Sequence, residues 1–231
     1  MSDAFKKAAG EAAAALVETE TVIGLGTGST AAFFIEALGR RLRDGLRVAG
    51  IPTSEATRKL ALAAGVDIIE PDETTKIALA IDGADEIGPR LSLIKGGGGA
   101  LLREKIIAEA AERFVVIADD TKVVASLGAF PLPIEIIPFG WAITVGRIRR
   151  IFNDLGFDAP KIDLRAAAPS KQFETDGGNW IVDCHLGRID DPYDLDQALR
   201  QLPGVVETGL FVRMADLAIV AGPDGLRRIE P

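Results

Sequence analysis

Apolar residues in the first half of the chain follow two alternating patterns, short continuous runs and longer runs with helical spacing. The short runs predict strands at 21–25, 46–51, 66–69, 77–81 and 114–118. The helical spacing predicts helices between them, at 29–43, 55–64 and 100–113. Strands that alternate with helices are typical of a parallel sheet with helices packed on it. We therefore expect an α/β fold with a doubly wound, Rossmann-like, mostly parallel sheet.

The pattern changes at Phe130–Pro133, where two prolines mark a boundary. The elements predicted after it are a strand, helix, strand, strand, helix and strand, at 134–137, 141–155, 161–164, 180–186, 195–202 and from 205. This βαββαβ order is that of a ferredoxin-like α+β unit. Residues 215–220 then predict a strand that returns to the first sheet. We expect an α/β catalytic domain of 1–129 plus 208–231, and a smaller α+β domain, 130–207, inserted near the C-terminus.

Composition and charge exclude several classes of protein. The 231 residues carry 26 basic and 34 acidic side chains, a formal net charge of −8, with no clustered basic stripe, so nucleic acid is not an expected partner. No apolar run approaches the ~18 residues of a membrane span, and Asp3 and Glu11 interrupt the Ala-rich N-terminus, unlike a signal peptide. A single cysteine excludes an intrachain disulfide and fits the reducing cytoplasm. We expect a cytoplasmic enzyme without a membrane or nucleic-acid partner.

The segment from Lys95 to Glu104 joins a lysine, four consecutive glycines and a glutamate at the start of a predicted helix. Glycine permits positive φ and has no Cβ, so successive backbone N–H groups can converge on an anion or a developing oxyanion. A flexible linker is the alternative, but an apolar strand precedes this run and a helix follows it directly. The pattern therefore favours a catalytic loop, to which Lys95 adds a full positive charge.

Glu104 is the candidate base of this segment. Its helical neighbours three and four positions away on both sides are all apolar. We expect partial burial to raise the pKa of Glu104 towards the range of a useful base. The alternative is a first-turn glutamate favoured only by the helix dipole, and the adjacent lysine and glycines favour catalysis.

A second glycine-containing loop, Gly24–Thr30, follows the first strand and opens a helix, which is where α/β proteins bind phosphate. It does not match the dinucleotide fingerprint, because Ser29 occupies the last glycine position. The hydroxyls of Thr27, Ser29 and Thr30 suit a single phosphate. The alternative is an ordinary tight turn in which Thr27 or Ser29 caps the helix.

The motif Asp82-Gly83-Ala84-Asp85 ends a predicted strand, at the edge where open α/β sheets place their sites. Its two carboxylates can accept sugar hydroxyls or exchange protons with them. A magnesium site and helix capping by Asp85 are the alternatives. Lys122 follows another strand and can reach the same crevice, although a lone lysine is usually a solvated charge.

Cys184 and His185 lie on opposite faces of an alternating strand, so we expect Cys184 in the core and His185 at the surface. With one cysteine and one histidine in the chain, neither a structural zinc site nor a Ser-His-Asp hydrolase is easily assembled.

Three motifs together, in this order and spacing, resemble type A ribose-5-phosphate isomerases. They are Gly26–Thr30, Asp82–Asp85, and Lys95–Gly98 with Arg103–Lys105. The likeness extends over nearly the whole chain, including Ile134–Pro138, Gly204–Val206 and Gly209–Phe211. It implies interconversion of D-ribose 5-phosphate and D-ribulose 5-phosphate in the non-oxidative pentose phosphate pathway, without a metal or an organic cofactor. It also implies a homo-oligomer, either a homodimer or a dimer of dimers.

Carried onto matching positions, the resemblance makes Glu104 the proton acceptor. The substrate site then consists of Thr27, Gly28, Ser29, Thr30, Asp82, Gly83, Ala84, Asp85, Lys95, Gly96, Gly97, Gly98 and Lys122. The chemistry agrees with this assignment, because moving a carbonyl between C1 and C2 needs a base and a group that stabilises an enediolate, here Lys95. Asp82 and Asp85 then hold hydroxyls, assist ring opening or relay a proton. The first glycine loop then anchors the phosphate with the help of Lys122, and Lys6 and Lys7 are further candidates for which the sequence does not decide a contact.

The chain departs from the family pattern at Leu102, where threonine is frequent, and at Phe139-Gly140-Trp141. Two other functions stay open. One is a magnesium-dependent hydride-shift isomerase. The other is a non-catalytic sugar-phosphate-sensing domain of the same fold, although the N-terminus offers neither a helix-turn-helix pair nor a basic face.

Overall fold

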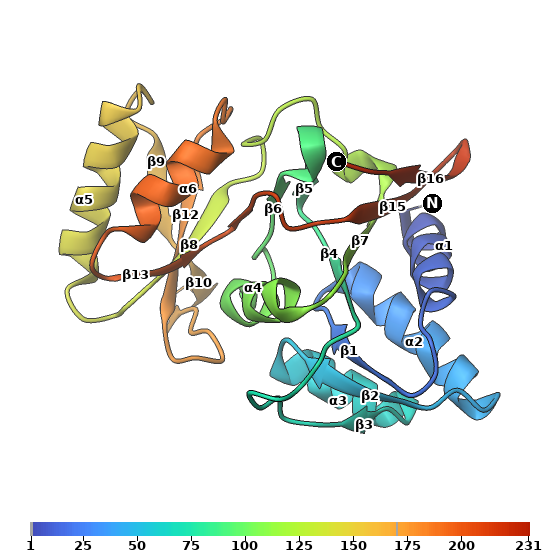
Figure 1. Cartoon of the computed structure of the whole chain (residues 1–231). Helices are drawn as coiled ribbons and strands as arrows, with labels where there is room; N and C mark the ends of the chain where they lie inside the picture. Colours follow the sequence, from blue (N-terminus) through green and yellow to red (C-terminus); the bar gives the residue numbers. More distant parts are fainter. Residues whose placement is uncertain (1, 170) are drawn as a thin grey trace. The chain divides into compact units, whose positions relative to one another are not determined.

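The structure, a computed structural model, describes residues 2–169 and 171–231. The chain forms two compact units, which we describe separately (Figure 1). Unit 1 comprises residues 1–84, 103–123 and 213–231, and unit 2 comprises residues 85–102 and 124–212. Among the described residues, no helix is both long and apolar enough to cross a membrane.

A seven-stranded sheet forms the centre of unit 1. Its strands are β1 (Thr21–Leu25), β2 (Val48–Pro52), β3 (Asp67–Ile68), β4 (Leu79–Gly83), β7 (Phe114–Asp119), β15 (Leu217–Gly222) and β16 (Gly225–Ile229). They lie in the order β16-β15-β7-β4-β1-β2-β3, and every neighbouring pair is parallel except the hairpin β15–β16. The order reverses between β1 and β4, which confirms the Rossmann-like sheet and the returning strand.

Helices cover both faces of this sheet. They are α1 (Ser2–Ala14), α2 (Ser29–Arg43), α3 (Glu55–Ala64) and α4 (Leu101–Ala110), the last of which begins in unit 2 and continues in unit 1. Phe34 and Leu38 of α2 share one apolar cluster with Ile23 of β1, and α1 and α3 contribute alanines to it. Gly24 faces the other side of the sheet, where Ile107 of α4 packs so closely that a Cβ on Gly24 would overlap it. The predicted helices at 29–43 and 55–64 agree with α2 and α3.

The main sheet of unit 2 is antiparallel and has four strands in the order β13-β8-β12-β9. Its strands and helices are β8 (Leu132–Ile136), α5 (Trp141–Asp154), β9 (Lys161–Leu164), β12 (Trp180–His185), α6 (Pro192–Arg200) and β13 (Val205–Thr208). Numbered within the unit, the strand order is 4-1-3-2, which confirms the ferredoxin-like unit. Its core includes Ile134, Ile148, Phe152, Val182 and Leu195. β8 begins two residues earlier than predicted and contains Pro133.

Unit 2 also contains short strands that the apolar pattern does not predict, because two or three residues show no period. The strands β5 (Glu86–Ile87), β6 (Leu93–Ile94) and β14 (Leu210–Phe211) form a sheet in the order β14-β6-β5. Strand β10 (Ala166–Ala168) pairs in antiparallel orientation with β11 (Lys171–Gln172). Two 3-10 turns, Pro89–Leu91 in unit 2 and Asp120–Lys122 in unit 1, complete the elements.

The boundaries of unit 2 differ from the expected segment 130–207, because the unit also includes 85–102, 124–129 and 208–212. The small sheet is one physical reason, since β5 and β6 lie before the expected boundary and β14 lies after it. A second reason is the buried carboxylate of Glu86. It accepts hydrogen bonds from the N–H groups of Gly128 at 2.7 Å and Phe130 at 2.6 Å.

Candidate active site

The loop after β1 leads directly into α2. The N-cap residue of α2 is Gly28, with φ of 107°, and no side chain at this position accepts a hydrogen bond from the first N–H groups of the helix. The alternative in which Thr27 or Ser29 caps the helix is therefore wrong. Ser29 is exposed and Thr30 is half-buried, so both hydroxyls lie at the start of the helix with access to solvent.

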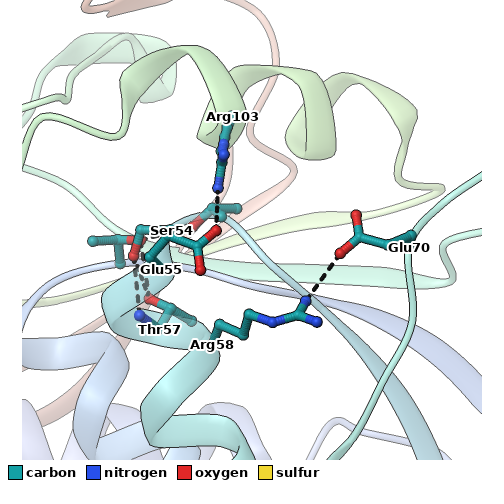
Figure 2. Close-up of polar contacts among 8 residues, drawn as sticks. Ser54, Glu55, Thr57, Arg58, Glu70 and Arg103 are labelled. Atoms are coloured by element: carbon teal, nitrogen blue, oxygen red, sulfur yellow. Dashed lines mark hydrogen bonds and ion pairs between the residues drawn. The ribbon is translucent and has the colours of Figure 1, made fainter. Parts of the chain in front are cut away.

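A cluster of hydroxyl groups joins this loop to the loop after β2. Thr27 Oγ1 lies 2.8 Å from Thr53 Oγ1 and 3.0 Å from Thr57 Oγ1, and it donates to Ser54 Oγ at 2.9 Å. Ser54 also caps α3, since its hydroxyl accepts the Thr57 N–H at 3.0 Å (Figure 2). Thr57 Oγ1 donates to the Gly26 carbonyl at 2.9 Å. The loop after β2 thus caps α3 and also holds the glycine loop, a contact that sequence reasoning missed.

Asp82 is the next-to-last residue of β4 and is 4% exposed. Its Oδ1 accepts the N–H of Thr27 at 3.0 Å and the N–H of Gly83 at 2.7 Å. A Cβ at Gly26 would overlap this carboxylate, which explains the glycine there. Because β1 and β4 are parallel neighbours, the two motifs meet at the carboxyl edge of the sheet, where the strand order reverses.

Lys122 ends the turn that follows β7, the strand on the other side of β4. Asp119 caps this turn by accepting the Thr121 N–H at 3.1 Å, and it also accepts the Ser2 hydroxyl at 3.2 Å. Burial raises the pKa of Asp119. Hydrogen bonds from Thr121 and Ser2 and the charge of Lys122 outweigh burial and hold that pKa below its usual value. The half-buried Lys122 therefore stands at the same sheet edge as Asp82, next to an ionised carboxylate.

Glu104 lies in the first turn of α4 and is 5% exposed, with its Oε2 atom shielded from solvent. Its four expected apolar neighbours are all buried, Ala100, Leu101, Ile107 and Ala108. Arg103, the residue before it, extends from α4 to Glu55 after β2, with 3.1 Å between Nη1 and Oε1 (Figure 2). The helix therefore begins at the carboxyl edge of the unit 1 sheet and places a buried carboxylate there.

A pocket of ≈ 280 Å³ opens beside this ion pair. Its lining includes Ile106, the Arg103–Glu55 pair and a second pair in which Arg58 Nη1 lies 2.9 Å from Glu70 Oε1 (Figure 2). Sequence reasoning gave these side chains no role. Their charges balance one another within the pocket.

Lys95 follows β6 in unit 2 and is 2% exposed. Its backbone N–H donates to the carbonyl of Gly209 at 2.9 Å, which fixes the residue to the strand segment before β14. Its Nζ lies 5.4 Å from the centroid of the Phe211 ring, a cation–π contact that fixes the direction of the side chain. A residue more than a hundred positions away gives no sequence signal for this contact.

The glycines after Lys95 are needed for geometry. Gly96 and Gly99 have φ of 100° and 81°, in the left-handed region that favours glycine. The Gly97 N–H donates to Asp85 Oδ2 at 2.8 Å, and a Cβ on Gly97 would lie 2.7 Å from Asp85 Oδ1. Asp85 precedes β5, so helix capping by Asp85 is wrong, and its carboxylate instead holds the glycine run.

The predicted site residues are divided between the two units. Thr27–Thr30, Asp82–Ala84, Glu104 and Lys122 belong to unit 1, and Asp85 and Lys95–Gly98 belong to unit 2. The chain passes directly from one set to the other at Ala84–Asp85 and at Leu102–Arg103. Within the described ranges, no group of three or more His, Cys, Asp or Glu side chains is placed to hold a metal ion.

Cys184 and His185 lie outside both sets. Cys184 is in the core of unit 2, where burial raises the pKa of its thiol far above its usual value. The exposed His185 contacts Asp163 at 3.0 Å. These positions confirm the interpretation of the alternating strand.

Comparison with known proteins agrees with the resemblance to ribose-5-phosphate isomerases that the sequence motifs indicate. The family model for ribose 5-phosphate isomerase A (phosphoriboisomerase A) matches residues 49–225. The ribose-5-phosphate isomerase A of Rhodopseudomonas palustris (strain BisB18) is 52% identical over 229 residues, which cover 99% of this chain and 98% of that protein. The solved ribose 5-phosphate isomerase from Plasmodium falciparum has a TM-score of 0.94 at 33% identity and covers 99% of each chain. A solved D-ribose-5-phosphate isomerase in complex with phospho-erythronic acid has a TM-score of 0.93 at 40% identity and covers 100% of each chain. The chain belongs to the ribose-5-phosphate isomerase A family.

Proposed function

We propose that this protein interconverts D-ribose 5-phosphate and D-ribulose 5-phosphate through an enediolate, as a step of the non-oxidative pentose phosphate pathway. The observation that carries the proposal is the burial of Glu104 and Lys95, two ionisable side chains that are 5% and 2% exposed. Burying such groups costs free energy unless they are paired or used, and they cluster at functional sites. Both lie in motifs of a chain that aligns with an isomerase almost from end to end.

Glu104 is the proposed base. It removes the proton from C2 of the open-chain aldose, and the same carboxyl group returns a proton to C1. A positioned general base contributes about 10²- to 10⁴-fold to such a step. The fixed first turn of α4, with Ile107 packed on β1, supports this role because it holds the carboxylate in one place.

Lys95 is the proposed electrostatic partner of the developing enediolate. Removing one oriented donor at an oxyanion typically costs about 3 to 4 kcal/mol of transition-state stabilisation. The contact with Phe211 and the backbone hydrogen bond to Gly209 support this role, since an ordered cation needs little reorganisation during the reaction.

Asp82 and Asp85 are proposed to hold sugar hydroxyls, to assist ring opening and to relay the proton between O1 and O2. Each accepts backbone N–H groups, so each carboxylate is fixed in orientation before substrate binds.

The phosphate is proposed to bind the loop at Thr27–Thr30, together with Lys122 and either Lys6 or Lys7. The start of α2 supports this assignment, because its first N–H groups receive no side-chain cap and anions bind well at such positions. Ser29 and Thr30 supply hydroxyls there. Thr27 contributes through its hydrogen bonds to the neighbouring loop, which hold the phosphate loop in shape.

A coupled assay that detects D-ribulose 5-phosphate formed from D-ribose 5-phosphate tests the function. We expect saturable turnover that is inhibited competitively by phospho-erythronic acid, the compound present in one related structure. That acid combines a phosphate with a carboxylate, whose negative charge resembles that of the enediolate in the proposed mechanism. Binding of both compounds without any turnover would instead indicate the sugar-phosphate sensor.

We also propose that the protein is a cytoplasmic homo-oligomer, a homodimer or a dimer of dimers. Support comes from the exposed apolar side chains of unit 2, with Phe139 92% and Ile143 69% exposed. Light scattering coupled to size-exclusion chromatography tests the oligomeric state. A monomer at micromolar concentration would contradict this part of the proposal.

A further inference from the structure

Arg165 lies between β9 and β10 in unit 2, and its side chain is only 13% exposed. Its guanidinium forms a two-pronged ion pair with Asp183 of β12, with Nε donating to Oδ2 at 2.9 Å and Nη2 donating to Oδ1. A planar fork on a carboxylate is among the most strongly directed contacts in proteins. The direction of the remaining donors of Arg165 is therefore fixed by β12.

Those donors point at the glycine run. Nη1 of Arg165 donates to the carbonyl of Gly96 at 2.7 Å and to the carbonyl of Gly97 at 3.2 Å. The ring of Phe173 stacks on the guanidinium, with 5.8 Å from Cζ to the ring centroid, and it also occupies the space that a Cβ on Gly99 would need. One arginine and one aromatic ring, both distant in sequence, thus contact the run near its two ends, Arg165 at Gly96 and Gly97 and Phe173 at Gly99.

Gly97 is held from both sides. Its N–H donates to Asp85 Oδ2 at 2.8 Å, and its carbonyl accepts from Arg165. A glycine run without such contacts has more conformational freedom than any other sequence of its length. The Gly96 carbonyl and the Gly97 N–H belong to one peptide group, so a rotation of this peptide would break the hydrogen bond to Asp85 and change the direction of the chain directly after Lys95.

We infer that Arg165 is a positioning residue for the isomerase reaction, which fixes the Gly96–Gly97 peptides and thereby the catalytic geometry of Lys95 and Asp85. The inference rests on the proposed function. Its physical basis is that the charge of Arg165 is directed to Asp183 and to backbone carbonyls within unit 2. The competing role for a buried cation in a sugar-phosphate enzyme is direct binding of the phosphate.

The two roles differ in their kinetic effect. If Arg165 positions Lys95, interactions made in the transition state are lost, and we expect Arg165→Met to lower kcat by about 10- to 100-fold with KM changed less than about threefold. Arg165→Lys should show most of the same loss, because an ammonium cannot reproduce the fork. A phosphate-binding arginine would instead raise KM by an order of magnitude or more while kcat stays near normal, and that result would overturn the inference.

A change in Asp183, the partner of Arg165, also distinguishes the two roles, and the variant is Asp183→Asn. It leaves Arg165 in the chain but weakens the contact that orients it. The positioning account expects a fall in kcat in the same direction as Arg165→Met. A fall in KM without loss of kcat would mean that the released cation binds substrate, and would contradict the account.

Two controls keep the test independent of folding. The double variant Arg165→Met/Asp183→Leu removes both charges together and should keep a near-normal melting temperature while showing the same loss of kcat. Arg188→Met removes an exposed arginine of the same unit, paired with Asp190 at 2.6 Å, and should leave both kinetic constants unchanged.

Hydrogen–deuterium exchange of the substrate-free protein gives a readout that does not depend on activity. We expect the amides of Gly96–Gly99 to exchange at least tenfold faster in the double variant, with the core strands of unit 2 unchanged. Unchanged exchange in this loop would overturn the inference even if the wild-type enzyme is active. An inactive wild type with faster loop exchange in the variant would contradict the proposed function but leave the clamp established.

Discussion

Thr27 carries a hydroxyl and a backbone N–H that are both used inside the protein. The hydroxyl contacts three others, from Thr53, Ser54 and Thr57, and the N–H donates to Asp82. Thr27 therefore connects the proposed phosphate loop, the loop after β2 and the carboxylate near the end of β4. The sequence suggests Thr27 as a phosphate ligand, but these contacts are with other protein groups that hold the loop in shape.

Thr27→Val removes this hydroxyl at nearly constant volume. We expect a loss of about 1 to 3 kcal/mol in the free energy of unfolding, because buried hydroxyls lose their partner. Denaturant unfolding measures it. Thr27→Ser keeps the hydroxyl and should lose less than half as much, whereas equal losses in the two variants would contradict the hydroxyl-cluster account.

At the residue scale, the sequence identifies side chains whose type and position already imply chemistry. Glu104 and Asp82 belong to this group, because each stands at the end or the start of a clearly periodic element. The sequence does not identify the partners that orient these predicted residues. Phe211 against Lys95 and Arg165 against Gly96 come from positions far along the chain, and only the folded topology brings them together.

At the scale of elements, α4 shows how packing places the proposed catalytic group. Its Ile107 fills the space that the missing side chain of Gly24 leaves on one face of β1, and Glu104 lies one turn before Ile107. The helix-period pattern predicts such a helix because its buried face repeats every three to four residues. Elements of two residues, such as β5 and β6, carry no period, so the sheet that supports Lys95 could not be predicted.

Gly24→Ala tests this packing. The added methyl would overlap Ile107 and would lie 3.0 Å from Ala80 Cβ, so we expect about 1 to 3 kcal/mol of destabilisation from overpacking and a measurable fall in kcat as α4 shifts. Thermal unfolding and the coupled assay measure the two effects.

Gly146→Ala is the matched control for that substitution. Gly146 lies in α5, where a new Cβ would have no atom within 4 Å apart from its chain neighbours and the backbone of its own helix. We expect this change to stabilise the protein slightly, by about 0.5 to 1 kcal/mol, with unchanged activity. A stable and fully active Gly24→Ala variant would show that the contact between α4 and β1 does not position Glu104.

At the scale of the whole molecule, the chain folds into two units whose sheets are of different kinds, and the proposed site residues are divided between the two units. The alternation of strand and helix runs predicts the first, and the βαββαβ order predicts the second. The boundaries between the two units are harder to predict from the sequence, because they depend on contacts such as those of Glu86 with Gly128 and Phe130. A hydrogen bond across more than forty residues leaves no trace in the local pattern.

The whole enzyme is predicted to work without a metal ion, because the charge of Lys95 stabilises the enediolate in the proposed mechanism. Dialysis against EDTA followed by the coupled assay in metal-free buffer should leave kcat and KM unchanged. Loss of activity that Mg²⁺ restores would favour the hydride-shift mechanism and remove the need for a carboxylate base.

The central claim is that Glu104 is the base, and Glu104→Gln tests it most directly. We expect kcat to fall by about 10²- to 10⁴-fold while calorimetry shows a substrate Kd within a few-fold of wild type, because the amide keeps the shape but cannot take a proton. Glu109→Gln changes an exposed glutamate of the same helix and should behave as wild type. A Glu104→Gln enzyme that turns over D-ribose 5-phosphate at a near-normal rate would contradict the account.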